Sequence, residues 1–197
     1  MKISMIILFL LSVVCILFSI GKTYAYLSSI FLIKGNTITV SSQNHIVINE
    51  VSPNGGKDQD WIELFNPTNK DIDLTGWMIH DNGANPENFS DSPTISANGY
   101  AVIVASSSAI TVPNGVTKII TTSPSIGNGL NPDSDYIQLL KPDSSVVDQT
   151  SYGSDKSIFN IATPSANQTV QRFPNGTDTD TSSDWHVANA TLGGVNQ

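Results

Sequence analysis

The sequence predicts an all-β fold, a sandwich or barrel of antiparallel strands, behind a hydrophobic N-terminal segment. The first observation is a series of short apolar runs of ordinary strand length. The second is a cluster of Gly, Pro, Asn or Asp between successive runs, and turns require these residue types. The third is that no helical period persists between these clusters. Short strands separated by turns build an antiparallel sandwich or barrel, and we expect almost no helix outside the N-terminal segment.

Seven apolar runs are predicted to form the strands. Each carries β-branched or aromatic residues, and at least one turn cluster lies between each run and the next. The predicted strands are residues 46–51, 61–65, 77–80, 100–104, 116–121, 136–140 and 146–148. The turn clusters between and after them are residues 53–56, 66–69, 81–83, 97–99, 113–115, 128–129 and 142–143. The tail, residues 164–197, is polar and loop-like, with one further strand at 169–173 and an apolar anchor at 185–187.

The first residues of the chain predict export. An almost wholly apolar stretch, residues 3–20, follows Lys2 and precedes small residues at Thr23 and Ala25, which is the pattern of a signal peptide, residues 1–25. The alternative is an uncleaved anchor, because about 18 apolar residues begin to reach across a bilayer. Residues 26–43 are read as a linker. In either case we expect a secreted or cell-surface protein, anchored in the membrane if the leader is not cleaved.

The composition excludes several classes of protein. The 197 residues include 17 acidic and 9 basic ones, for a formal net charge of -8, and a single cysteine. A negative chain does not offer a general phosphate-binding surface, so nonspecific nucleic-acid binding is not expected. One cysteine cannot form a disulfide framework or a multi-cysteine metal site. That cysteine lies in the predicted leader, so the exported part contains none and must be held by its core and hydrogen bonds.

Six motifs follow one another in a recognisable order. They are Ile48-Asn49-Glu50-Val51, Asp60-Trp61-Ile62-Glu63-Leu64-Phe65-Asn66, Asp73-Leu74-Thr75-Gly76-Trp77, Asp135-Tyr136-Ile137-Gln138-Leu139, Gln171-Arg172-Phe173-Pro174-Asn175-Gly176 and Asp184-Trp185. This order resembles the lamin-tail domain family in its secreted bacterial or archaeal form, over residues 44–197. The resemblance implies an immunoglobulin-like β-sandwich with a loop-rich C-terminal extension and no enzymatic activity. The chain departs from the family pattern at Thr191-Leu192-Gly193 and at Ser134-Asp135.

Three tryptophans have two interpretations each. Trp61 and Trp77 lie in apolar runs, which favours a place in the core over a platform for stacking sugars. Trp185 lies in the polar tail and is equally compatible with either role. The three histidines, His45, His80 and His186, have no metal-binding spacing.

Acidic residues supply two candidate sites. Glu50 and Glu63 lie inside predicted strands, but sequence alone does not show that they converge as catalytic carboxylates would, and the resemblance gives them no catalytic role. We therefore expect no enzyme. Asp178, Asp180 and Asp184 form the densest acidic cluster and are a candidate Ca²⁺ site, the one cofactor considered. The alternative is that these aspartates cap turns in a solvated loop.

Four Asn-x-Ser/Thr sequons are glycosylation candidates if the host modifies exported proteins. They are Asn88, Asn167, Asn175 and Asn189.

The function expected from these observations is a non-enzymatic binding or tethering module at the cell envelope, with an envelope protein or glycan as its partner. Two alternatives stay open. The domain could accompany an extracellular nuclease or phosphatase, or it could be a structural protein of the surface whose sheet edges self-associate.

Overall fold

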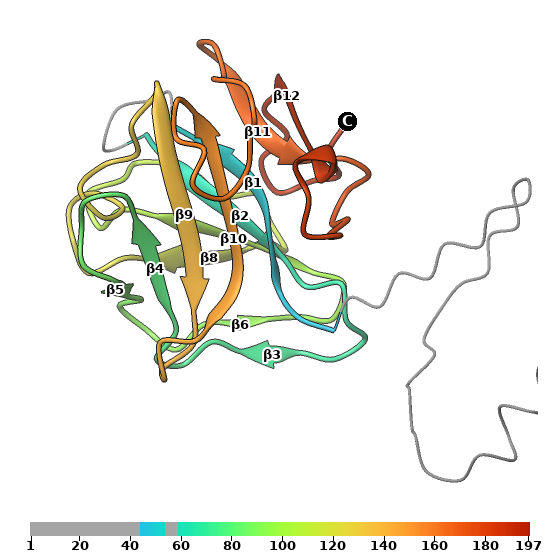
Figure 1. The fold of residues 1–197 in the computed structure, drawn as a ribbon. Helices are drawn as coiled ribbons and strands as arrows, with labels where there is room; N and C mark the ends of the chain where they lie inside the picture. Colours follow the sequence, from blue (N-terminus) through green and yellow to red (C-terminus); the bar gives the residue numbers. More distant parts are fainter. Residues whose placement is uncertain (1–43, 54–58) are drawn as a thin grey trace, which may run out of the picture. The chain divides into compact units, whose positions relative to one another are not determined.

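Strands form where the apolar runs lie, and the turn clusters separate them. The computed structural model describes residues 44–53 and 59–197 (Figure 1). Strands β2 (Trp61–Phe65) and β7 (Tyr100–Val104) have the bounds predicted from sequence. The predicted leader, residues 1–25, and the predicted linker, residues 26–43, lie outside the described residues. The described residues belong to one compact unit, Gln43–Gln197.

The larger sheet has six strands in the order β12-β11-β1-β2-β7-β8. Neighbouring strands are antiparallel except β7 and β8, which run parallel and are joined by residues 105–116. The remaining strands of this sheet are β1 (Val47–Ser52), β8 (Thr117–Ile120), β11 (Gln168–Arg172) and β12 (Trp185–Asn189).

The second sheet has four strands in the order β10-β9-β4-β5, and it lies against the larger sheet (Figure 1). Its two longest strands form a hairpin, β9 (Ser134–Leu140) and β10 (Val146–Gly153), with β10 at the edge of the sheet. β10 extends beyond its predicted end because it pairs with β9 along most of its length. The other strands are β4 (Met78–Asp81) and β5 (Glu87–Asn88), and a separate two-stranded sheet joins β3 (Ile72–Asp73) to β6 (Thr94–Ile95).

Strand alternation directs one face of each sheet into a common apolar core. Ile62 and Leu64 of β2 and Ile137 and Leu139 of β9 are completely buried and belong to one cluster. The intervening residues of β9 point away from this core. The architecture is an all-β sandwich, as predicted, and it agrees with the expected immunoglobulin-like fold.

A smaller apolar cluster covers the other face of the larger sheet at β2 and β7. It contains Trp61, Val102 and Val104, and part-buried residues that include Ile110 and Leu192 pack against it. The expectation that Trp61 belongs to the core is therefore confirmed. Trp77 is part-buried against the main core, and Trp185 is buried within it.

The C-terminal tail is more ordered than the sequence indicates. The expected loop-like extension contributes β11 and β12 to the larger sheet, between which lies a short 3₁₀-helix, η1 (Ser182–Asp184). The apolar pattern did not predict β12 as a strand, because polar residues in it give only weak alternation. Within the described part of the chain, no helix is long and apolar enough to cross a membrane.

Candidate functional site

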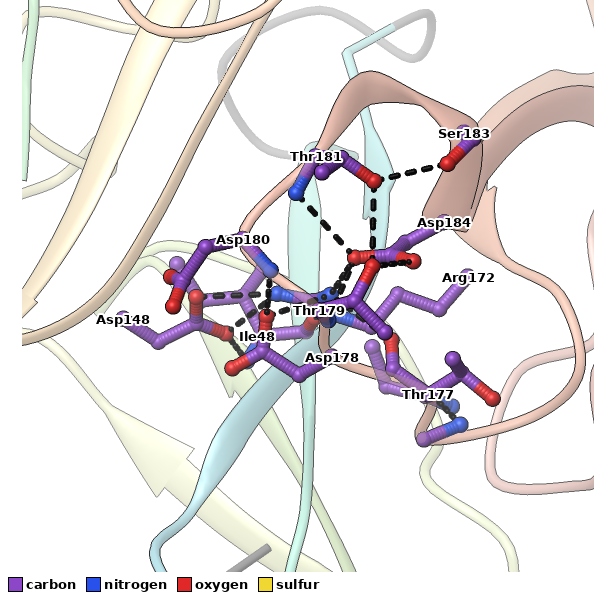
Figure 2. A network of polar contacts seen from close by, with 12 residues as sticks. Ile48, Asp148, Arg172, Thr177, Asp178, Thr179, Asp180, Thr181, Ser183 and Asp184 are labelled. Atoms are coloured by element: carbon purple, nitrogen blue, oxygen red, sulfur yellow. Dashed lines mark hydrogen bonds and ion pairs between the residues drawn. The ribbon is translucent and has the colours of Figure 1, made fainter. Parts of the chain in front are cut away.

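The Asp-rich segment folds around Arg172, the single arginine of the chain, which ends β11 (Figure 2). The side chain of Arg172 is completely buried. Its Nη2 donates to both carboxylate oxygens of Asp148 at 2.9 Å, and its Nη1 donates to Asp178 Oδ1 at 3.1 Å. The Asp184 Oδ2 atom lies 3.6 Å from Nη1. Two backbone carbonyls accept further hydrogen bonds from the guanidinium. One buried cation thus joins the tail to β10.

Two rings complete the surroundings of this charge network. The Trp185 ring centroid lies 4.4 Å from the Arg172 guanidinium carbon, within the range of a cation–π contact. His45 Nε2 lies 3.1 Å from Asp178 Oδ2. This hydrogen bond, together with the charge of Arg172, lowers the pKa of Asp178 to about 2 despite partial burial. The same contact with Asp178 raises the pKa of His45.

The three aspartates of the predicted calcium site do not converge on a common point. Asp178 faces Arg172, whereas Asp184 accepts hydrogen bonds from the backbone N–H and hydroxyl of Thr179 and from the backbone N–H of Thr181. Asp180 is exposed. Among the described residues, no group of three or more His, Cys, Asp or Glu side chains is arranged to hold a metal ion. The geometry favours the alternative, turn capping and charge pairing, over the predicted calcium site.

Glu50 of β1 and Glu63 of β2 lie directly opposite each other in the larger sheet. Both side chains are completely buried on the face that the last residues of the chain cover. Thr191 donates its backbone N–H and its hydroxyl to the two oxygens of Glu50. Glu63 accepts the backbone N–H of Gly193 at 2.6 Å and the Asn49 amide at 2.7 Å. The tail thus closes over both carboxylates.

Burial raises the pKa of both Glu50 and Glu63. Loss of solvation raises the pKa of Glu63 to about 8, and it also raises the pKa of Glu50. The hydrogen bonds that both carboxylates accept oppose this shift without cancelling it. Because neither carboxylate is exposed, neither can reach a substrate, and a catalytic pair gains no support.

The four sequons differ in their surroundings. Asn88, Asn167 and Asn189 are exposed. Asn175 is half-buried, and its amide donates to the Tyr100 hydroxyl and accepts a hydrogen bond from Asn49 Nδ2. A glycan on Asn175 would break these contacts, so the geometry is unfavourable there. At the other three positions glycosylation stays a prediction.

An open polar groove lies on the outer face of the four-stranded sheet, with a volume of about 490 Å³. Its floor contains Tyr136 and Gln138, which point away from the core, and Gln149, which lies opposite Gln138 on β10. Ser157, Ile158 and Phe159 form one wall, and Asp180 belongs to the other. We define the groove by Tyr136, Gln138, Gln149, Ser157, Ile158, Phe159 and Asp180.

The floor of the groove is held by a chain of side-chain contacts. His80 Nδ1 lies 3.1 Å from Gln138 Oε1, and Gln138 Nε2 donates to Gln149 Oε1 at 2.9 Å. The His80 and Tyr136 rings meet edge to face at a centroid distance of 5.4 Å. These contacts orient an aromatic ring and two amides toward solvent.

Reasoning from sequence did not identify Arg172 or this groove. One feature of the sequence could have indicated Arg172, because a lone arginine next to an Asp-rich segment is a candidate ion-pair partner. The only sequence feature of the groove is the alternation of Tyr136 and Gln138 with apolar neighbours, which any half-exposed strand shows.

The fold and these sites define an immunoglobulin-like β-sandwich module whose buried charges are bonded within the protein. The family model of the lamin tail domain matches residues 39–154, which is more than half of the chain. The chain therefore belongs to the lamin tail domain family. The matched segment ends after β10, so β11, β12 and Arg172 lie beyond it. A comparison with curated proteins finds no match.

Proposed function

We propose that the protein is a secreted or surface-held, non-enzymatic module that binds a component of the cell envelope and tethers its own chain there. Membership of the lamin tail domain family supports this proposal, since the family consists in general of non-catalytic immunoglobulin-like domains. The apolar segment at residues 3–20 supports export.

The observation that carries the proposal is the division of polar groups between the interior and the groove. The buried carboxylates of Asp148, Glu50 and Glu63 all accept hydrogen bonds from within the fold. The Tyr136 ring and the Gln138 and Gln149 amides instead face an open groove. A rigid scaffold that presents unreactive polar and aromatic groups is suited to binding rather than to bond cleavage.

Cell fractionation and cosedimentation test this function. The full chain is expressed in an exporting host, and its N-terminus is sequenced in the medium, membrane and wall fractions. The recovered protein is then sedimented with purified envelope that has been stripped of other proteins. We expect export and saturable cosedimentation. Retention in the cytoplasm, or an absence of binding to any envelope fraction, would count decisively against the proposal.

A further inference from the structure

The walls of the groove are fixed by contacts that lie outside it. The Ser151 hydroxyl, buried in β10, accepts the backbone N–H groups of Ile158 and Phe159 and donates to the Phe159 carbonyl. On the other side, the backbone N–H of Asp180 donates to Asp178, which Arg172 holds in turn. Both walls are therefore positioned before any ligand arrives, which reduces the entropy lost on binding.

Among the described residues, the lining contains two aromatic rings and planar polar groups but no basic side chain. Tyr136 and Phe159 supply the rings, Gln138 and Gln149 supply amides, and Asp180 supplies a charged group. An anionic ligand such as a phosphate polymer would meet a carboxylate without a cation to compensate it, so the charge disfavours it.

A neutral sugar chain matches this lining. The apolar C–H faces of pyranose rings pack on aromatic side chains, while sugar hydroxyls both donate and accept hydrogen bonds. Gln149 accepts from Gln138 through Oε1, and its Nε2 is left to donate to a ligand. A carboxylate such as Asp180 accepts from two neighbouring hydroxyls. The volume of about 490 Å³ is within the usual range for small-ligand sites, and the groove is open to solvent.

We propose that this groove binds a neutral oligosaccharide, with Tyr136 as the stacking platform and with Gln149 and Asp180 as hydrogen-bonding partners of the sugar hydroxyls. This inference rests on the proposed envelope-binding function and names the ligand class of its site. Gln138 and His80 act as positioning residues, because their contacts orient Gln149 and Tyr136.

The test uses the full exported chain and three neutral probes: soluble oligomers of β-1,4-glucose, α-1,4-glucose and β-1,4-N-acetylglucosamine. Binding is followed by calorimetry and by NMR of the side-chain amides. We expect saturable binding of at least one probe, with shifts concentrated on the Gln138 and Gln149 NH₂ signals. Tyr136→Ala is expected to weaken that binding about tenfold because the stacking ring is lost. Asp180→Asn is expected to weaken it about tenfold because the sugar hydroxyls then donate to a neutral amide oxygen instead of a carboxylate.

Matched controls separate the groove from the fold. Asn tolerates the positive φ of 56° at position 180, so Asp180→Asn retains the backbone there. Asp91→Asn makes the same change at an exposed position outside the groove lining and is expected to leave binding unchanged. Tyr136→Phe keeps the ring and is expected to lose less affinity than Tyr136→Ala. Melting curves of each variant establish that it is folded.

The outcomes distinguish this inference from the function on which it rests. If Tyr136→Ala and Asp180→Asn still cosediment with envelope and no neutral oligomer binds, the groove is not an oligosaccharide site, and the tethering function is unaffected. A preference for an anionic polysaccharide such as heparin also contradicts the proposal that the groove binds a neutral oligosaccharide. Loss of envelope binding in both variants, but not in Asp91→Asn, supports the groove as the binding site. If oligosaccharides bind but envelope does not, the groove is an oligosaccharide site and the proposed tethering function is wrong.

Discussion

Replacement of Arg172 by methionine is the sharpest test of how the C-terminal tail is held. Methionine has a similar length and fills the space beside Trp185, but it removes the cation from between Asp148 and Asp178. The variant retains the carboxylates in their buried positions. Arg172→Met therefore isolates the loss of charge compensation from the loss of side-chain volume.

The expected cost follows from the burial of the guanidinium. Removal of one partner from a buried ion pair leaves an uncompensated charge and destabilises proteins by about 3–5 kcal/mol. The side chains of Arg172 and Asp148 are 0% and 3% exposed, so solvent screening offers little relief. For a domain of this size, such a loss lowers the melting temperature by about 10 °C.

Urea unfolding of the two proteins near neutral pH and at about pH 5 is the assay. Burial raises the folded-state pKa of Asp148 above its unfolded value even with Arg172 in place, and loss of the guanidinium removes the charge that opposes this shift. In the variant this carboxylate therefore takes up its proton at a higher pH than in the wild type, and the gap in unfolding free energy between the two proteins narrows as the pH falls. Lys156→Met removes the same charge at an exposed site and is expected to change stability by less than about 0.5 kcal/mol.

Two results would refute this reasoning. One is a loss smaller than about 1 kcal/mol at neutral pH, which would mean that water or a rearranged tail compensates the carboxylates. The other is a difference in unfolding free energy between Arg172→Met and wild type that does not narrow in acid. That result would mean that the lost stability comes from packing against Trp185 instead of from charge.

Four further outcomes are expected. Glu63 keeps its proton to about pH 8 in the folded state, so wild-type stability falls as the pH rises from the ordinary glutamate range toward 8, and Glu63→Gln should flatten this decline in pH-dependent melts. Deletion of residues 191–197 removes donors to Glu50 and Glu63 and should cost roughly 3 kcal/mol in urea unfolding. Gly127→Ala places a Cβ against the Asp81 carboxylate at a positive φ and should cost about 2 kcal/mol or more by the same measurement. Calcium or a chelator should leave the melting temperature unchanged, because the Asp178 carboxylate already accepts a hydrogen bond from Arg172. A rise of several degrees with calcium would instead show that these aspartates bind the metal.

The strands of the sandwich were predictable because their signals are local. β2 and β7 carry strong apolar patterns between turn residues, and both have the predicted bounds. Alternation along β2 is enough to put Ile62 and Leu64 on one face of the strand and Glu63 on the other, and the structure has this arrangement. A period of two depends only on the backbone geometry of a strand, so sequence is sufficient to read it.

The tail shows where local signals fail. β12 forms because β11 supplies its hydrogen-bonding partners, and residues 191–197 are ordered because Glu50 and Glu63 accept their amides. None of these partners is close in the chain. A polar segment therefore looks like a loop in sequence even where the fold gives it a fixed place.

By itself, the sequence determined the class of the fold, the positions of most strands and the resemblance to the lamin tail domain, and it predicted an exported leader. The fold class and the strand positions rest on composition and short-range periodicity, and the resemblance rests on the order of the motifs. Only the tertiary structure decided that Asp178 and Asp184 face Arg172, that Glu50 and Glu63 are closed off by the tail, and that Tyr136 and Asp180 line one groove. For the glutamates and the groove the physical reason is distance along the chain, since packing brings together groups whose separation in sequence carries no record of their contact. For Arg172 the aspartates are near in sequence, and it is the burial of its side chain, set by the packing of the two sheets, that sequence does not record.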